Sequence, residues 1–433
     1  MDVIATIAAS MPDARSRAIP RAELAVAWTG IGLVAVHVID DNFLQPEPGT
    51  SASGHLVSGL VPLSALLALA WFYPRIRAGA RASFALVVGV LGIAIGTAEA
   101  VYYALKVGAS GDDYTGFLAL AAGVALVGLG AFTLWRTRRT DDGHVRRYLR
   151  RVMLVAGSLL VAYVLVMPVA VSYVFTHAAR AVVPEAKLGA PYENVSFKTS
   201  DGLELNGWYV PSKNGAAVVV FPGRTGPQRQ ARMLVRHGYG ALVFDRRGEA
   251  TSDGAPNVFG WEFDKDLEAA SAFLQRRPDV DAQRIGGIGL SVGGEALLQA
   301  AAGSDAYDAV VSEGAGVRSI RELLMLEQRG IWHFVPSMGV ITAATAIFSN
   351  TSPPPSLEDL SARIKTPVFF IYAGHGQGGE NLNPRYYAAA SEPKTLWKIA
   401  EGKHTGGIEA RPAEYERRVV GFFDEHLLGD RSS

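Results

Sequence analysis

Two kinds of hydrophobic pattern divide this chain. Up to residue 175 the apolar residues form five runs, each close to the roughly 20 residues that a helix needs to cross a bilayer. These runs are Ala22–Ile39, Leu56–Tyr73, Ala82–Leu105, Gly116–Trp135 and Val152–Phe175. Short charged loops separate them, which favours transmembrane helices over buried helices of a soluble protein. We therefore predict a tail over residues 1–21 and a five-helix transmembrane domain over residues 22–175.

The loops between these runs differ in charge. The N-terminal tail, the second loop and the fourth loop together contain 13 Lys and Arg residues, whereas the first and third loops contain only Lys106. Cytoplasmic loops retain positive charge, so the N-terminus is expected in the cytoplasm. Five crossings then leave everything after Phe175 outside the cytosol. We expect a multi-pass plasma-membrane protein whose first run stays as an anchor, because that run lacks the features of a cleaved signal peptide.

After Arg180 the pattern changes, because apolar runs shrink to strand length and turn pairs such as Asp201-Gly202 separate them. The predicted strands are Glu193–Thr199, Leu203–Val210, Ala216–Phe221, Ala241–Asp245, Arg284–Ile288, Ala309–Ser312, Val368–Ala373 and Thr395–Ala400. The first two alternate in polarity, the rest are apolar, and helical patterns fill the gaps. This indicates an α/β domain over residues 192–433, reached through a linker over residues 176–191, with a mostly parallel sheet covered on both faces.

Composition agrees with this division and excludes several functions. The chain has 433 residues, of which 49% are hydrophobic and only 19% charged, below the usual quarter. Its 41 Lys and Arg residues equal its 41 Asp and Glu residues, so no basic field attracts nucleic acid, and no nucleic-acid-binding motif is present. The absence of cysteine excludes disulfides, thiolate metal sites and a cysteine nucleophile.

One serine lies in a motif with clear chemistry. The segment Gly289-Leu290-Ser291-Val292-Gly293-Gly294 follows the fifth predicted strand and opens a helical run. A serine on such a sharp turn needs neighbours without Cβ atoms for its hydroxyl to stand clear. The start of the helix adds the positive end of its dipole near the serine oxygen. We therefore predict Ser291 as a nucleophile.

A serine nucleophile needs a base, and the base needs a carboxylate that orients it. His404 directly follows the last predicted strand, where a base would reach the edge of the sheet. Glu380 is the first carboxylate after the seventh strand and is our preferred acid. Glu313, immediately after the sixth strand, remains the alternative, since a neighbouring strand end can deliver a carboxylate to the same histidine. His375, in the loop of Glu380, is expected to pack or hydrogen-bond locally.

Negative charge that develops on a substrate oxygen must meet N–H groups already aimed at it. Val292, the residue after the serine, is expected to supply one. The second is expected from the turn Pro222-Gly223-Arg224, where Gly223 lets the backbone approach and Arg224 offers its backbone N–H. The Arg224 side chain could also contact an anionic substrate, or it could simply be a solvated loop arginine.

Together these motifs resemble the α/β-hydrolase family, in the branch of bacterial esterase-like and serine-aminopeptidase-like hydrolases. The resemblance runs from about Tyr192 to Leu428. Its pieces are Asp201-Gly202 with Gly207-Trp208, Phe221-Pro222-Gly223, Asp245-Arg246-Arg247-Gly248 with Ser252-Asp253-Gly254, the serine motif, and Gly402-Lys403-His404. It implies an eight-stranded core, a Ser–His–acid triad and hydrolysis through an acyl-enzyme.

The sequence departs from the family pattern in two places. Pro222-Gly223 stands where members commonly have His-Gly, and the glycine-rich loop ending in Glu380 stands where they commonly have Asp. The resemblance also implies that four other charged residues are structural, namely Asp245, Arg246, Asp264 and Asp266.

The substrate is suggested only by a segment of about fifty residues between the sixth and seventh strands. It is predicted to form a cap over about residues 317–356, and it contains the apolar run Ile331–Phe348. An apolar cap near a bilayer suits a lipid-like or otherwise hydrophobic ester, although these residues could merely be the core of the cap.

Two classes of function follow from these features. The leading hypothesis is a membrane-anchored serine hydrolase acting on a small-molecule carboxylic ester or an amide, and a peptidase or an acyltransferase would use the same triad. The alternative is a non-enzymatic membrane receptor or sensor whose hydrolase-like domain binds a ligand.

Ionisable residues near the outer ends of the first three runs also stand out: His37, Asp40, Asp41, His55 and Glu99. Such residues usually face the interior of a helix bundle, and they could bind a divalent metal ion or line a small pocket. No Glu-x-x-His or His-Glu-x-x-His spacing supports a metal site. We expect hydrogen-bonded interfacial residues, and neither a metal ion nor a cofactor. This half of the chain resembles no family that we can name.

Overall fold

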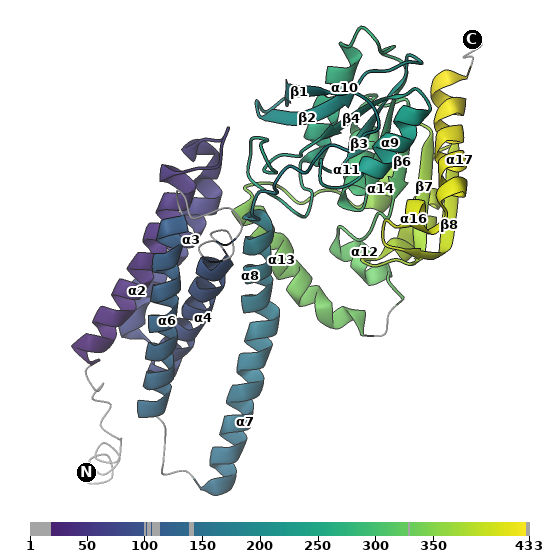
Figure 1. Ribbon diagram of the computed structural model, residues 1–433. Helices are drawn as coiled ribbons and strands as arrows, with labels where there is room; N and C mark the ends of the chain where they lie inside the picture. The colour runs from purple at the N-terminus through teal and green to yellow at the C-terminus, as the bar shows by residue number, and fades with distance from the viewer. Residues whose placement is uncertain are drawn as a thin grey trace, which may run out of the picture. The chain divides into compact units, whose positions relative to one another are not determined.

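The computed structural model describes residues 19–98, 101, 105, 113–137, 143–327 and 330–429 (Figure 1). The chain divides into two compact units. The first contains Met1–Asp41 and Gly59–Gly157, and the second contains Asn42–Ser58 and Ser158–Ser433. Residues 42–58 join the second unit through an ion pair of 2.7 Å between Glu47 and Arg180 and a hydrogen bond of 2.8 Å from Gly254 N to Pro48 O.

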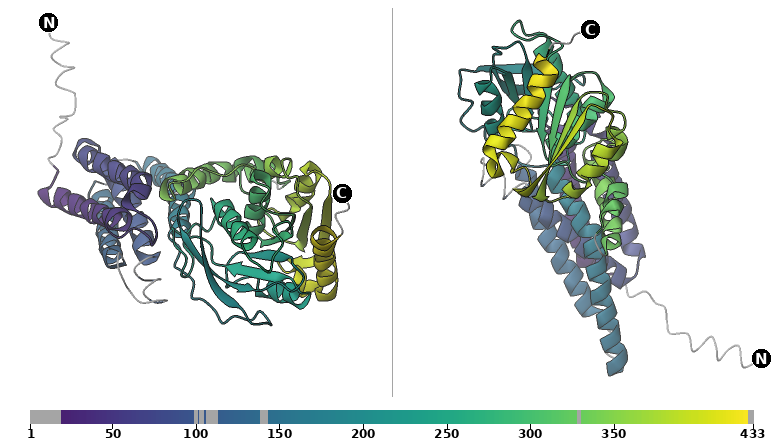
Figure 2. Two further views of the ribbon diagram at one scale, coloured as in Figure 1. Left: turned by 90° about the horizontal axis from the view of Figure 1, so that it is seen from above. Right: turned by 90° about the vertical axis from the view of Figure 1, so that its right-hand side faces the viewer.

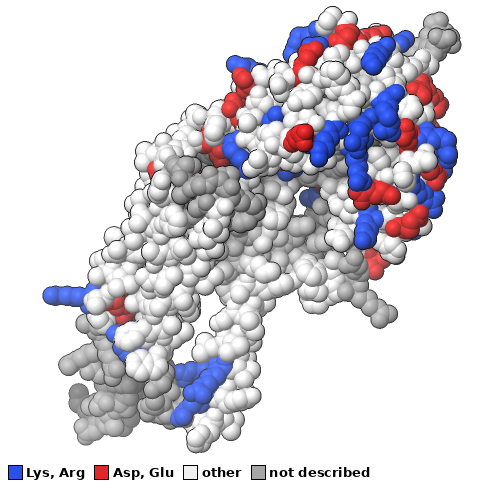
Figure 3. Space-filling model, in the orientation of Figure 1, with Lys and Arg blue, Asp and Glu red and all other residues white. Residues whose placement is uncertain are grey.

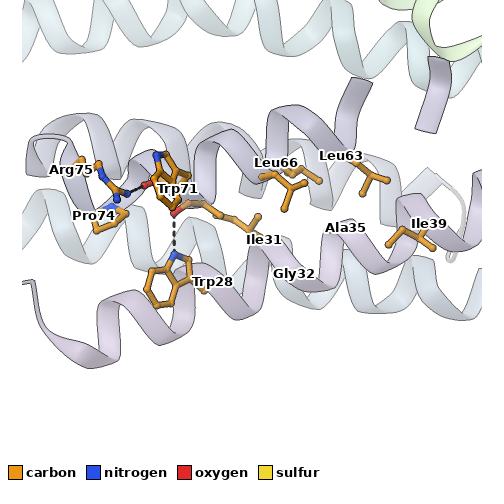
Figure 4. Close-up of a pocket in the computed structure, with 12 residues that line it drawn as sticks. Trp28, Ile31, Gly32, Ala35, Ile39, Leu63, Leu66, Trp71, Pro74 and Arg75 are labelled. Atoms are coloured by element: carbon orange, nitrogen blue, oxygen red, sulfur yellow. Dashed lines mark hydrogen bonds between the residues drawn. The ribbon is translucent and has the colours of Figure 1, made fainter. Parts of the chain in front are cut away.

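The described residues of all five predicted apolar runs are helical. The helical segments are α2 (Arg21–Ile39), η1 (Asp40–Leu44), η2 (Ala52–His55), α3 (Leu56–Phe72), η3 (Tyr73–Arg75), α4 (Ala78–Gly96), α6 (Asp113–Arg136), α7 (His144–Val161), η5 (Ala162–Val166) and α8 (Met167–Thr176). Within the described ranges, six helical stretches are long and apolar enough to cross a membrane. The sixth, Ile331–Phe348, lies in the segment that the sequence assigned to the cap. In Figure 3, charged side chains gather over the sheet-containing unit, and the surface of the long helices is mostly uncharged.

Glycines allow α4 and α6 to approach closely. A Cβ atom on Gly123 would lie 2.6 Å from Gly89 O, and one on Gly96 would lie 2.6 Å from Gly116 O. Lipid tails are as apolar as the helices, so helix association in a bilayer depends on close packing of small residues rather than on the hydrophobic effect. The contact between α4 and α6 therefore depends on the absence of side chains at these positions.

A buried ion cluster joins three helices of the first unit. Glu23 of α2 is 5% exposed and accepts hydrogen bonds from Arg81 of α4 at 2.8 Å and from Arg136 of α6 at 2.6 Å. A buried carboxylate is tolerated only when it is paired. Two arginines that the sequence suggested only as loop charges thus neutralise a buried acid.

Two of the ionisable residues near the outer ends of the first runs, His37 and Asp40, share one hydrogen-bond partner. His37 Nδ1 lies 3.1 Å from Thr115 Oγ1, which donates to Asp40 Oδ2 at 2.9 Å. His55 belongs to the second unit and lies 2.9 Å from Thr50 Oγ1. Glu99 lies outside the described residues. Within the described part of the chain, no three His, Asp or Glu side chains come together as metal ligands would.

All eight predicted strands are confirmed and form one sheet. They are β1 (Glu193–Lys198), β2 (Glu204–Val210), β3 (Ala217–Phe221), β4 (Gly240–Phe244), β5 (Ile285–Leu290), β6 (Ala309–Glu313), β7 (Val368–His375) and β8 (Lys394–Lys403). The spatial order is β1-β2-β4-β3-β5-β6-β7-β8. β2 pairs antiparallel with β1 and with β4, and every other pair is parallel. The predicted mostly parallel sheet is therefore correct.

Helices cover both faces of this sheet (Figure 2). The helices after β3 are α9 (Gln228–Arg236), α10 (Phe263–Gln275), α11 (Val292–Gly303), α12 (Ile320–Met325), η6 (Ile331–Phe334), α13 (Val335–Phe348), α14 (Leu357–Ser361), η7 (Glu380–Leu382), α15 (Asn383–Ala389), α16 (Gly407–Ala410), α17 (Pro412–Phe423) and η8 (Asp424–Leu428). Successive side chains of a strand point to opposite faces, so Val219 of β3 joins the core beneath α10 and α11, and Val218 joins the core beneath α9 and α17. This double cover explains why the central strands are continuous apolar runs.

Candidate active site

Ser291 occupies a strained turn between β5 and α11. Its backbone has φ +53° and ψ −125°, a conformation that costs a non-glycine residue roughly 1–3 kcal/mol. The neighbouring strand holds it in place, because Ser291 N donates to Glu313 O at 2.8 Å. A Cβ atom on Gly289 would collide with Gly293 O, so the turn requires glycine there. The predicted serine on a strand-to-helix turn is thus present, with a partly buried side chain.

His404 and Glu380 complete a chain of hydrogen bonds to this serine. His404 directly follows β8, and its Nε2 lies 2.8 Å from Ser291 Oγ. Its Nδ1 is hydrogen-bonded to Glu380 Oε1, from the segment after β7. Glu380 is 2% exposed, and its other oxygen accepts from Ala373 N at 2.9 Å. With Glu380 ionised, Nδ1–H donates to the carboxylate, so Nε2 accepts the proton of the serine hydroxyl.

The surroundings of His404 favour its protonated form. The hydrogen bond to Glu380 raises the pKa of His404 above its ordinary value of 6.5, partial burial opposes this, and the charges of Glu380, Glu313 and Glu295 add to the rise. An imidazole in this setting is stabilised when it takes a proton from the serine.

Glu313, the alternative acid, has other partners. Its Oε1 accepts from Gly407 N at 2.9 Å and its Oε2 accepts from the Tyr415 hydroxyl at 2.6 Å. Burial raises the pKa of Glu313, and these two hydrogen bonds oppose that rise. Glu313 therefore anchors the segment after His404, and the structure places Glu380 rather than Glu313 against Nδ1.

The two expected oxyanion donors differ in their hydrogen bonding. Val292 is the first residue of α11, so its N–H has no carbonyl partner within the helix. The backbone N–H of Arg224 instead donates to Asp245 Oδ1 at 2.8 Å, and its Nε donates to Asp245 Oδ2 at 2.7 Å. Asp245 is fully buried and needs these partners. The expectations of a free Arg224 N–H and of a solvated Arg224 side chain are therefore wrong.

Other predicted residues take structural positions. Asp266 is fully buried and accepts hydrogen bonds from Arg247 N at 2.9 Å and from Arg247 Nε at 2.8 Å. His375 ends β7 with an exposed side chain. Asp245 and Asp266 thus each fix a loop of the sheet edge through an arginine.

Sequence reasoning missed one charged residue beside the expected oxyanion turn. A Cβ atom on Gly223 would lie 2.6 Å from Glu249 Oε2, so this carboxylate borders the turn. Burial raises the pKa of Glu249, and the charge of Arg246 opposes this rise. Arg246 Nε lies 3.3 Å from Glu249 Oε2. Its position directly after Arg246-Arg247-Gly248 was the available signal.

Comparisons with known proteins agree with this fold. A family model described as X-Pro dipeptidyl-peptidase (S15 family) matches residues 179–367. Among curated relatives, the uncharacterized protein YfhR of Escherichia coli O157:H7 is 25% identical over 261 residues, which are 55% of this chain and 84% of that protein. An uncharacterized protein of Mycobacterium tuberculosis H37Rv is 30% identical over 223 residues, which are 49% of this chain and 72% of that protein.

Among solved structures, an esterase of Pyrococcus furiosus has 21% sequence identity and a TM-score of 0.48, covering 58% of this chain and 98% of the esterase. The eight-stranded sheet and the serine on its strand-to-helix turn agree with the S15 family match, and the mycobacterial relative is 30% identical over 72% of its length. The chain therefore belongs to the α/β-hydrolase family.

Proposed function

We propose that this protein is a membrane-anchored serine hydrolase that cleaves a carboxylic ester through an acyl-enzyme. The observation that carries the proposal is the hydrogen-bond chain from Ser291 Oγ through His404 to Glu380. An amide is the alternative bond, and transfer of the acyl group to an acceptor other than water would use the same three residues.

In the first half of the reaction, Ser291 Oγ attacks the carbonyl carbon of the ester while its proton moves to His404 Nε2. Glu380 holds the imidazole and stabilises the imidazolium that forms. The carbonyl oxygen becomes negative and accepts from Val292 N–H at the positive end of α11. The tetrahedral intermediate then collapses as Nε2 protonates the leaving alcohol, which departs and leaves the acyl group on Ser291.

In the second half, water replaces the alcohol. His404 Nε2 takes a proton from the water, whose oxygen attacks the acyl carbon, and the same N–H group receives the oxyanion. Collapse returns that proton to Ser291 Oγ and releases the carboxylic acid.

We further propose that the N-terminus is cytoplasmic and that the hydrolase domain lies on the extracytoplasmic side of the plasma membrane. The asymmetry of 13 basic residues against one in the loops supports this orientation. Protease added to intact cells should cut the hydrolase domain but not a tag on the N-terminus. Cleavage of the tag in intact cells would contradict this orientation and indicate the reverse one.

The enzymatic proposal is tested with the full chain in nanodiscs and a panel of p-nitrophenyl esters of increasing acyl length. Wild type should hydrolyse at least one ester, and Ser291→Ala and His404→Ala should fall to the uncatalysed background. Ser304→Ala, just after the other end of α11, is the matched control and should keep wild-type activity. Full activity in Ser291→Ala, or no turnover by wild type, would contradict the proposal.

A further inference from the structure

Helix α13 and the turn η6 before it have an unusual surface for part of a soluble domain. Residues 331–348 contain no Asp, Glu, Lys or Arg. Trp332 is 73% exposed and Phe334 is 45% exposed. Both aromatic residues belong to η6, and large exposed apolar side chains in an uncharged segment indicate a surface that another apolar phase covers.

One face of α13 packs along the last apolar helix of the N-terminal half. Ser172 Oγ donates to Ile341 O at 3.1 Å, and Ser337 Oγ donates to Tyr163 O at 3.1 Å. Small hydroxyl side chains that hydrogen-bond between helices are typical of helix pairs inside membranes. Figure 1 shows α13 beside α8.

Ring contacts show how far α13 extends along that helix. Phe334 lies 6.3 Å from Tyr163, and Phe348 lies 5.4 Å from Tyr173. Tyr163 precedes Thr176, the last residue of α8, by 13 residues. At 1.5 Å per residue this is about 20 Å of helix, against a hydrocarbon core of about 30 Å.

The end of the same helix lies close to the candidate nucleophile. Val258 N donates to Phe175 O at 2.9 Å, and the rings of Phe175 and Phe259 are 5.1 Å apart. A Cβ atom on Gly260 would lie 2.5 Å from Val292 Cγ2. One short loop thus separates the last turn of α8 from the residue next to Ser291.

A second, adjoining face of α13 packs against the hydrolase core. Val335 and Met338 pack against the same hydrophobic cluster that Val292 contacts. The helix therefore connects the core beside Ser291 to the last apolar helix.

We propose that α13 is inserted in the bilayer beside α8, and that Ser291 takes its substrate directly from the membrane. The substrate would be a bilayer lipid with a long acyl ester. Its acyl chain would lie along α8 and α13, and its ester group would lie at the membrane surface next to Phe175. This inference rests on the proposed hydrolase function and narrows its substrate to membrane lipids.

Insertion of α13 is tested without any activity measurement. The natural chain has no cysteine, so one spin label can be placed by Trp332→Cys in nanodiscs. Val182→Cys, at a 76% exposed position before the sheet, is the matched control. The label at position 332 should be accessible to oxygen, which dissolves in the bilayer, and inaccessible to a water-soluble nickel chelate. The label at position 182 should be accessible to the nickel chelate and less accessible to oxygen. A nickel-accessible label at position 332 would overturn the insertion of α13.

Substrate access is tested by comparing two esters on the same protein, a long-chain phospholipid in vesicles and soluble p-nitrophenyl butyrate. Phe334→Glu should lower the ratio of lipid to soluble turnover by about tenfold, since a carboxylate is costly inside the bilayer. Val182→Glu should leave the ratio unchanged. Turnover of only the soluble ester by wild type would overturn the lipid substrate, whereas turnover of neither ester would overturn the hydrolase function itself.

Discussion

The assignment of the orienting acid can be tested by a matched pair of substitutions, Glu380→Gln and Glu313→Gln. Both side chains are buried and both keep their shape in the amide form. Only Glu380 contacts His404 Nδ1, whereas Glu313 bonds to Gly407 N and Tyr415. The two variants therefore distinguish the effect of losing the carboxylate that contacts His404 from the effect of losing a buried carboxylate nearby.

The expected magnitudes differ by several orders. An amide at position 380 could present its NH2 group to Nδ1 and stabilise the wrong tautomer, which costs about ten-thousand-fold in kcat for a Ser–His–acid triad. Glutamine at position 313 can still accept from Gly407 N and hydrogen-bond to Tyr415. Glu313→Gln should therefore change kcat by less than about tenfold and stability by about 1 kcal/mol.

The pH profile gives a second readout. His404 must be neutral to act as a base, and Glu380 is the main cause of its raised pKa. Activity of wild type should therefore rise with pH through a pKa above 6.5. In Glu380→Gln the residual activity should reach its plateau at lower pH. The assay is kcat/KM for a soluble ester across pH, and wild-type activity in Glu380→Gln, or an equal loss in Glu313→Gln, would refute the reasoning.

Two predictions concern the first unit. Glu23→Ala leaves Arg81 and Arg136 without their shared carboxylate, and should lower stability by about 3–5 kcal/mol, measured as thermal unfolding in detergent. Gly123→Leu should separate α4 from α6 and lower the melting temperature, whereas Gly128→Leu, where a Cβ atom meets nothing within 4 Å, should not. Equal melting temperatures for the two glycine variants would contradict the packing argument.

Much of the fold follows from the sequence because its signals are local. Parallel strands buried on both faces are continuous apolar runs and the first two strands alternate in polarity, so all eight strands were found within a few residues. Chain order and strand ends were also enough to select Ser291, His404 and Glu380, which the structure brings within hydrogen-bond distance of one another.

The errors concern partners that are distant in the chain. The N–H of Arg224 was expected to be free, but Asp245, 21 residues later, engages it. The charges of Arg81 and Arg136 were counted as loop charges because nothing local indicates that Glu23 lies between them. The run Ile331–Phe348 has the composition of either a cap core or a membrane helix, and its packing against α8 is a contact between distant parts of the chain that the sequence does not show.

The central claim is that Ser291 is the nucleophile of an acyl-enzyme. The most direct measurement is to treat the full chain in nanodiscs with a fluorophosphonate probe and to locate the adduct by peptide mass spectrometry. The account predicts one adduct, on Ser291, which is absent in Ser291→Ala and strongly reduced in His404→Ala. An unlabelled wild-type protein, or an adduct that persists in Ser291→Ala, would contradict it.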